Sequence, residues 1–136
     1  MIRAVLDTNV LVSALLSAAG APAALIRAWQ DGAFELVTSP LLIEELRGVL
    51  ARPKIRRFIS EDGGRGFIRL LEAQSWRAED PVGPERLAPD PQDDFVIALA
   101  LAEGGVLVTG DARLRSQPII GHVVLEPHAF RGALNV

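Results

Sequence analysis

Two patterns of apolar residues run along the chain, one typical of buried strands and one typical of helices. Short apolar runs of the kind found in buried parallel strands predict strands at 5–6, 34–37, 74–78 and 106–109, and the runs 119–120 and 123–125 suggest a fifth. Apolar residues at helical spacing predict helices at 10–17, 23–31, 40–52, 54–58, 67–73, 91–102 and 127–134. Because strands and helices alternate without repeats or linkers, the sequence predicts one α/β domain over residues 1–136 with a mostly parallel sheet.

Residues with strong local preferences mark several of these boundaries. Ser39 is a good N-cap, and Pro40 suits the first position of the helix that follows. Gly32 is expected to end the helix at 23–31. The run Glu-Asp-Gly-Gly at 61–64 predicts a turn before the helix at 67–73.

The composition is that of a packed globular protein. The chain has 136 residues and is 49% apolar, which is enough for one hydrophobic core. Its net charge of -3, with no basic tail, does not predict strong electrostatic binding to nucleic acid. Cysteine is absent from the sequence, which excludes disulfides and thiolate metal sites.

The apolar N-terminal stretch has some features of a secretion signal. However, Asp7 and Asn9 would fall inside the apolar part of such a signal, where a charge is poorly tolerated. No apolar run is long enough to span a bilayer. We therefore expect a cytoplasmic protein with no membrane association.

Two aspartates follow predicted strands. Asp7 comes directly after the apolar run that ends at Leu6, and Asp111 follows the strand at 106–109. Ligands of open α/β sheets bind at the carboxyl ends of the strands, so the two carboxylates approach each other if the strands are adjacent. Taken alone, Asp7 is best explained as a helix cap and Asp111 as part of a Gly-Asp turn.

Further acids lie at the beginnings of two helices. At 100° per residue, Glu45 flanks the apolar face of its helix, whereas Glu44 points nearly opposite, into solvent. Asp93 and Asp94 lie in the first turn of the helix at 91–102, behind the expected N-cap Asp90. Each acid also has a purely structural explanation, as a cap or a solvated residue, so only their joint placement favours a common site.

Several carboxylates cannot converge without a counter-charge, because close like charges disfavour joint ionisation. A hard divalent cation would supply that charge, and oxygen-only ligands suit Mg²⁺ or Mn²⁺. His122 and His128 lack the spacing of a zinc motif. A bound Mg²⁺ or Mn²⁺ can activate water and stabilise charge on a phosphoryl oxygen, so the acids predict phosphodiester hydrolysis.

Four short motifs resemble those of the PIN-domain family of metal-dependent ribonucleases. The first is Leu-Asp-Thr-Asn-Val-Leu-Val-Ser at 6–13, and the second is the helical segment 39–50, which carries Glu45. The third is Asp-Pro-Gln-Asp-Asp at 90–94, and the fourth is Leu-Val-Thr-Gly-Asp at 107–111. Their order and spacing cover most of the chain. The chain is most similar to the small bacterial and archaeal PIN proteins proposed as toxins of toxin–antitoxin pairs.

This resemblance implies a sheet of about five strands with helices on both faces, and an acid quartet that binds Mg²⁺ or Mn²⁺. Carried onto this sequence, the quartet is Asp7, Glu45, Asp93 and Asp111. Asp93 is preferred to the alternate Asp94 because it lies three residues after Asp90. Asn9, Ser13 and Thr109 would orient the metal ligands or a water. The implied partners are an RNA substrate, an antitoxin protein and a second copy in a homodimer.

The leading hypothesis is therefore a Mg²⁺- or Mn²⁺-dependent endoribonuclease. One rival is a non-catalytic RNA- or protein-binding module on a PIN-like scaffold, which would not need four acids. Another is a phosphatase-type domain, but the single lysine, Lys54, lies far along the chain from Asp7. The cations Arg52, Lys54, Arg56 and Arg57 are most simply a solvated face, and otherwise a phosphate-binding surface.

Overall fold

The computed structural model describes residues 1–82, 91–115 and 123–136, apart from the side chains at 91–94, 113 and 115. Within them a five-stranded parallel sheet has the order β3-β2-β1-β4-β5. The strands are β1 (Arg3–Leu6), β2 (Glu35–Thr38), β3 (Trp76–Arg77), β4 (Val106–Val108) and β5 (Val124–Leu125). The predicted parallel α/β sheet is confirmed, while the strand residues expected at 119–120 lie outside the described residues.

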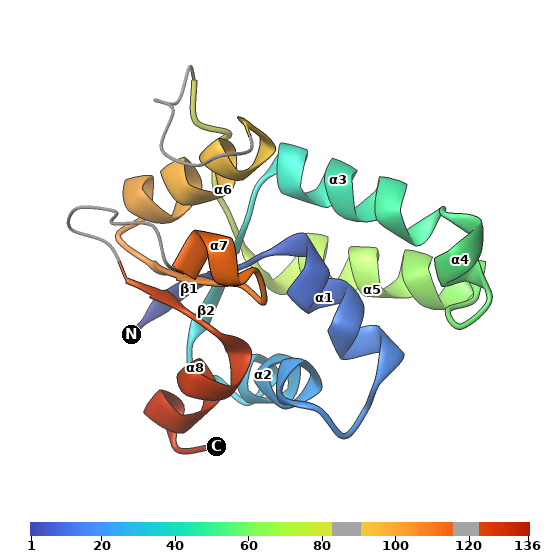
Figure 1. Ribbon diagram of the computed structural model, residues 1–136, viewed down its shortest axis with the longest axis horizontal. Helices are drawn as coiled ribbons and strands as arrows, with labels where there is room; N and C mark the ends of the chain where they lie inside the picture. The colour runs from blue at the N-terminus through green and yellow to red at the C-terminus, as the bar shows by residue number, and fades with distance from the viewer. Residues whose placement is uncertain (83–90, 116–122) are drawn as a thin grey trace.

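Helices precede or follow each strand (Figure 1). They are α1 (Thr8–Leu16), α2 (Ala21–Gln30), α3 (Pro40–Leu50), α4 (Pro53–Arg56), α5 (Glu61–Gln74), α6 (Pro91–Ala102), α7 (Ala112–Arg115) and α8 (Pro127–Leu134). The described part of the chain has no single helix long and apolar enough to cross a membrane. Among the described residues, one pair of helices, α1 and α2, reaches that length and composition together, and it is bent by 97° at the junction.

Helices cover both faces of the sheet, as predicted, because successive strand residues point to opposite sides. Val5 and Leu107 belong to a cluster of buried residues built mainly on α6. Leu6, Leu36 and Val108 belong to a second cluster, built on α1, α2, α3, α5 and α8. The central strands are therefore buried on both sides, which explains why their sequences are apolar without alternation.

The strand order reverses between β1 and β4. The chain proceeds from β1 to β2 and β3 on one side, and then returns to place β4 on the other side of β1. At such a switch point the loops that leave the carboxyl ends of the two strands diverge and leave a crevice between them. The fold thus provides a crevice beside Asp7, which follows β1, and Thr109, which follows β4.

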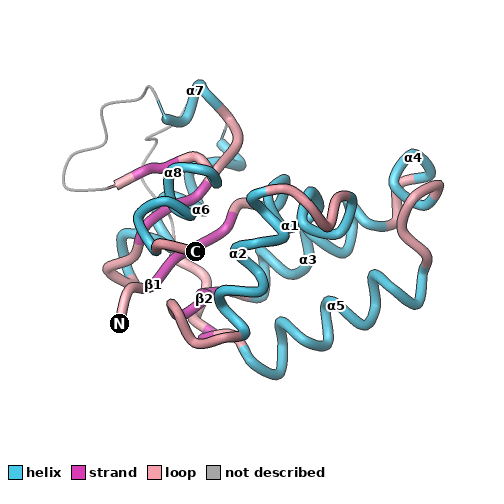
Figure 2. The backbone as a smooth tube through the Cα atoms, turned by 90° about the horizontal axis from the view of Figure 1, so that it is seen from below, coloured by secondary structure: helices cyan, strands magenta, loops and turns pink. Residues whose placement is uncertain are grey.

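The helices α3 and α5 run side by side away from the sheet and are joined at their far end by α4 (Figures 1 and 2). Ser39 caps α3 as predicted, because its hydroxyl accepts a hydrogen bond from the N–H of Leu42 at 3.3 Å. Gly32, at φ 86°, ends α2 as predicted.

The turn predicted at 61–64 is wrong, because these residues form the first turn of α5. The hydroxyl of Ser60 accepts from the N–H of Gly63 at 3.0 Å and caps the helix. Gly64 is buried close to Leu50, so a glycine serves there for helix packing instead of chain reversal. The short helix α7 was not predicted. The expected N-cap Asp90 and the histidine His122 lie outside the described residues.

Candidate active site

Asp7 is held in a fixed position at the junction of β1 and α1. Its backbone N–H donates to the carbonyl of Val108 at 2.9 Å, which continues the pairing of β1 with β4 by one residue. Its carboxylate accepts two hydrogen bonds of 2.8 Å, one from the N–H of Thr8 and one from the hydroxyl of Thr109. Asp7 is also the N-cap residue of α1, so the structural and the functional explanations of this residue are compatible.

Thr109 links the two strand-end aspartates. Its buried hydroxyl accepts a hydrogen bond from the backbone N–H of Asp111 at 3.1 Å and donates to Oδ2 of Asp7 at 2.8 Å. Because that hydroxyl has one proton, accepting from Asp111 directs the proton toward Asp7. The prediction that Asp7 and Asp111 approach each other is confirmed, and Thr109 orients the first of them.

A cleft of about 350 Å³ opens at this edge of the sheet. It lies between α1 and α3, which pack against each other, and the strand ends form part of its lining. The residues that line it are Asp7, Thr8, Asn9, Val12, Ser13, Glu45, Val49, Arg52 and Asp111. Three members of the predicted quartet and two of the predicted orienting residues therefore share one cleft, while Thr109 lies beneath it, bonded to Asp7.

The helix phase of α3 separates its two adjacent glutamates, as predicted. Glu45 is half-buried and lines the cleft, whereas Glu44 is exposed and pairs with Arg47 at 3.1 Å. Glu45 and Val49 lie one turn apart on α3 and share its face toward the cleft, while Arg52 enters the cleft from beyond the end of α3, as the N-cap residue of α4.

Burial raises the pKa of Asp7 above its ordinary value, because the carboxylate is only 8% exposed. The hydrogen bonds from Thr109 and Thr8 oppose this shift, and the nearby charge of Asp111 adds to it. The protein thus holds two acids close together where water cannot fully stabilise their charges. A cation placed in the cleft would favour the ionised form of both.

A buried hydroxyl lies beside these acids without a partner. Oγ1 of Thr8 is inaccessible to solvent and makes no hydrogen bond in the described part of the chain. An unsatisfied buried polar atom costs about 1–3 kcal/mol. Thr8 lines the cleft through other atoms, because its Oγ1 is not accessible to solvent. A water or a phosphoryl oxygen could contact this hydroxyl only after the side chain rotates.

For Asp93, the fourth acid of the predicted quartet, the structure describes the backbone alone. Asp93 and the alternate Asp94 lie in the first turn of α6, and their side chains are outside the described residues. The next residue, Phe95, lines a hollow together with Leu41 and Glu45. The first turn of α6 thus lies beside the α3 glutamate that enters the cleft. Among the side chains that the structure describes, no three acids or histidines lie close enough together to hold a metal ion.

Arg52 lines the cleft, although its sequence context, beside other cations, favours a solvated face. The signal in the sequence is its spacing of seven from Glu45 within the helix predicted at 40–52, since residues at i, i+4 and i+7 share a helical face. Thr8 also lines the cleft, whereas its sequence context, between Asp7 and Asn9, indicates only a turn former.

Comparisons with known proteins bear on the family and the fold of the chain. A family model described as the PIN domain matches residues 3–113. An uncharacterized protein of Methanocaldococcus jannaschii is 26% identical over 117 residues, which cover 85% of this chain and 74% of that protein.

Two crystal structures have a similar fold. PAE2754 from Pyrobaculum aerophilum superposes with a TM-score of 0.69 at 18% identity, over 98% of this chain and 90% of that one. VapBC2 from Rickettsia felis, solved bound to a DNA fragment from its promoter, superposes with a TM-score of 0.63 at 16% identity. The superposition covers 92% of this chain and 98% of that one. At such low identity these structures support the fold, and the family follows from the model that spans most of the chain. The chain belongs to the PIN domain family.

Proposed function

We propose that this protein is an endoribonuclease that hydrolyses RNA phosphodiester bonds with a bound Mg²⁺ or Mn²⁺. The observation that carries the proposal is that the carboxylates of Asp7, Glu45 and Asp111, from three separate parts of the fold, line one cleft with the cation Arg52. The similarity to VapBC2 supports a further part of the proposal, that the chain acts in the cytoplasm as the toxin of a toxin–antitoxin pair.

The residues of the cleft fit a hydrated divalent ion. Mg²⁺ commonly keeps several of its waters and is bound by one or two carboxylates together with substrate phosphates. Because Asp7, Glu45 and Asp111 lie too far apart to ligate one ion directly together, some of them, with Asp93 from α6, would hold the ion through its waters in a cleft with room for them. When bound, such an ion lowers the pKa of a water molecule and neutralises charge on a phosphoryl oxygen.

The residues of the chain itself supply position and charge. The hydrogen bonds from Thr8 and Thr109 fix the orientation of the Asp7 carboxylate and leave part of each oxygen available to a ligand. The guanidinium of Arg52 provides donors for a phosphate of the RNA.

Cleavage of a defined RNA panel in Mn²⁺ and in chelator tests the proposal. Loss of an outer partner of a metal ligand costs about 10- to 100-fold, so Asp7→Asn should reduce cleavage at least about 100-fold. Asp31→Asn, which changes an exposed residue at the end of α2, is the matched control and should cleave like the wild type. RNA binding without cleavage in any divalent metal would support the non-catalytic module instead.

The adjacent acid pairs refine the test. Glu45→Gln should reduce cleavage far more than Glu44→Gln, because only Glu45 lines the cleft. Asp93→Asn should reduce it far more than Asp94→Asn if the motif spacing identifies the ligand. Equal losses within the aspartate pair would remove Asp93 from the proposed quartet without affecting the other three residues.

A further inference from the structure

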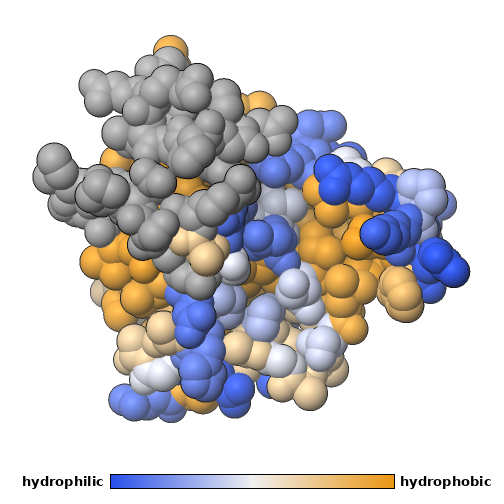
Figure 3. Space-filling model, viewed as in Figure 1, coloured by the Kyte–Doolittle hydropathy of each residue, from blue (hydrophilic) through white to orange (hydrophobic). Residues whose placement is uncertain are grey.

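The segment that follows α3 is unusual in its charge. Residues 46–60 contain five of the 14 cationic residues and no acidic residue, in a chain whose net charge is -3. In the described part of the chain Arg52, Lys54 and Arg57 enter no ion pair, although other arginines do so. Figure 3 shows strongly hydrophilic residues at the end of the molecule that carries α4. An acidic protein thus concentrates unpaired positive charge in one place.

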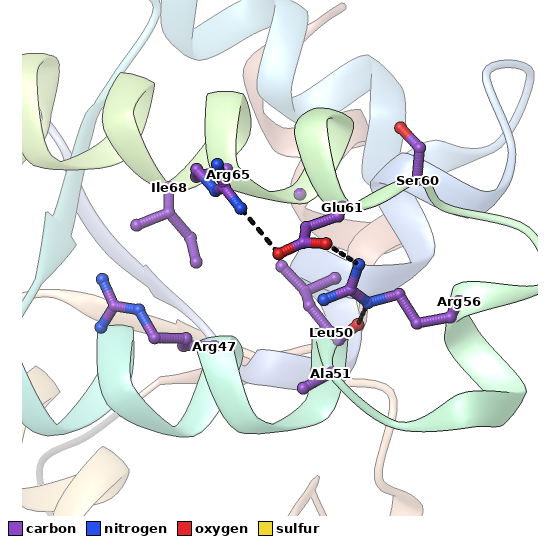
Figure 4. Close-up of a pocket in the computed structure, with 9 residues that line it drawn as sticks. Arg47, Leu50, Ala51, Arg56, Ser60, Glu61, Arg65 and Ile68 are labelled. Atoms are coloured by element: carbon purple, nitrogen blue, oxygen red, sulfur yellow. Dashed lines mark hydrogen bonds and ion pairs between the residues drawn. The ribbon is translucent and has the colours of Figure 1, made fainter.

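The other two cations of this stretch have structural roles. Figure 4 shows Glu61 between Arg56 and Arg65. The carboxylate of Glu61 forms an ion pair with each guanidinium, at 3.6 Å to Arg56 and 2.6 Å to Arg65. Arg56 also donates to the carbonyl of Leu50 at 3.2 Å, and Arg47 pairs with Glu44. These contacts join α3, α4 and α5 and fix the orientation of the short helix α4.

Apolar contacts fix the same segment from beneath. Ile55 packs against the main core and Ile59 is buried. Next to these two anchors, Lys54 just before Ile55, and Arg57 and Phe58 between Ile55 and Ile59, are exposed. The segment is therefore held in place while these three side chains extend into solvent.

Phe58 is the most exposed aromatic residue of the chain, at 76%. Other aromatic residues are buried or have partners; Trp76, for example, is 45% exposed and stacks under the guanidinium of Arg3 at 4.1 Å. An exposed ring beside unpaired cations is the combination that binds single-stranded nucleic acid, since bases stack on the ring and phosphates contact the cations. A second copy of the chain would bring these like charges together, which disfavours a dimer through this surface.

The segment is continuous with the cleft. Arg52 lines the cleft and also forms the N-cap of α4, so Lys54 and Arg57 follow it within the next five residues. We propose that residues 52–58 form a track for single-stranded RNA, in which Lys54 and Arg57 contact phosphates and Phe58 stacks on a base outside the cleft. This inference rests on the proposed function for the choice of RNA as the ligand.

Binding of a fluorescent oligo-adenylate to the whole protein in chelator, followed by anisotropy over a range of salt concentrations, tests the track. Chelator prevents metal-dependent cleavage, so the result does not depend on whether the protein is a nuclease. For the double variant Lys54→Gln/Arg57→Gln we expect weaker binding and a salt dependence reduced by about 0.7 in log–log slope for each cation removed. Arg27→Gln, an exposed arginine on α2, is the control and should bind like the wild type.

Variants of the ring separate stacking from charge. Phe58→Leu should weaken binding at least about fivefold with an unchanged salt slope, and Phe58→Trp should restore it, because a base needs an aromatic face. Inorganic polyphosphate, which has phosphates but no bases, should compete for the wild type and bind Phe58→Leu equally well. The substituted residues Lys54, Arg57 and Phe58 are all exposed, so the variants should remain folded. A melting temperature close to that of the wild type checks this for each variant.

Wild-type affinity in both the double variant and Phe58→Leu would overturn the track, whether or not the protein cleaves RNA. Binding of polyglutamate as tight as that of oligo-adenylate would also overturn it, and would indicate an acidic protein partner. A dimer in sedimentation that Phe58→Leu dissociates would assign the surface to self-association instead. If the track variants lose RNA binding but no RNA is cleaved, the track stands and the nuclease proposal fails.

Discussion

At the scale of single residues, the central feature is that Asp7 is both a helix cap and a constrained acid. Its carboxylate is buried, accepts two hydrogen bonds and lies near the charge of Asp111. Its pKa is raised, so burial outweighs the hydrogen bonds in the absence of a cation. The metal-free fold therefore carries a destabilising charge at this position.

This imbalance predicts a pH-dependent effect of Asp7→Asn on stability in chelator. An acid whose pKa is higher in the folded than in the unfolded protein favours the folded state at a pH below the unfolded-state pKa. This contribution to stability is lost as the pH rises through the pKa of the folded state. The variant should therefore gain stability relative to the wild type as pH rises above about 3.8. Melting temperatures of both proteins in chelator at pH 4 and pH 8 measure the difference, and a variant that is less stable at both values would show that Asp7 serves mainly as a cap.

Residue chemistry made part of the site predictable. Asp7 and Asp111 are charged residues that interrupt apolar strand patterns, and Glu45 follows from helix phase, so each could be found in the sequence. Thr8 could not be assigned in this way, since only the three-dimensional packing shows that its hydroxyl is buried without a partner. The acid role of Asp93 remains a prediction.

At the scale of elements, the pairing of β1 with β4 positions the site, and a glycine permits it. A Cβ on Gly105 would lie 2.9 Å from the backbone carbonyl oxygen of Arg3. Because that atom belongs to the backbone of the central strand, it cannot move aside without shifting β1. The register that brings Asp7 to Thr109 therefore depends on the absence of a side chain at this position.

Gly105→Ala should destabilise the fold by about 1–3 kcal/mol, as overpacking commonly does. The matched control is Gly48→Ala, on an open part of α3 where a Cβ meets nothing within 4 Å. That change should stabilise the helix by up to about 1 kcal/mol, since alanine is the better helix former. Urea denaturation of both variants measures the two free energies of unfolding, and equal effects would show that the contact with Arg3 is unimportant.

Element boundaries were predictable where one residue dominates the local conformation, as Ser39 and Gly32 do. They were not predictable where packing overrides local preference. The residues 61–64 read as a turn because of two glycines, yet α5 forms through them because Ser60 caps it and Phe67, Ile68 and Leu71 bury one face. The four residues of α7 are too few to show a helical period.

At the scale of the whole molecule, sheet topology decides the location of the site. The strand order reverses between β1 and β4, so the two strand-end aspartates come together although they are more than 100 residues apart in sequence. Alternation of strands and helices predicted the parallel sheet, but not which strands are neighbours. Helix α3 then adds Glu45 from a different side of the cleft, and the N-cap residue of α4 adds Arg52.

The most direct test of the account is a calorimetric titration of Mn²⁺ into the wild type, Asp111→Asn and Asp31→Asn. Asp111 lines the cleft from the segment that follows β4, whereas Asp31 is exposed at the end of α2, so both variants lose the same charge at different places. If the acids form one metal site, Asp111→Asn should bind Mn²⁺ at least about tenfold more weakly and Asp31→Asn should match the wild type. Equal Mn²⁺ affinity in all three proteins would contradict the metal site at the strand ends.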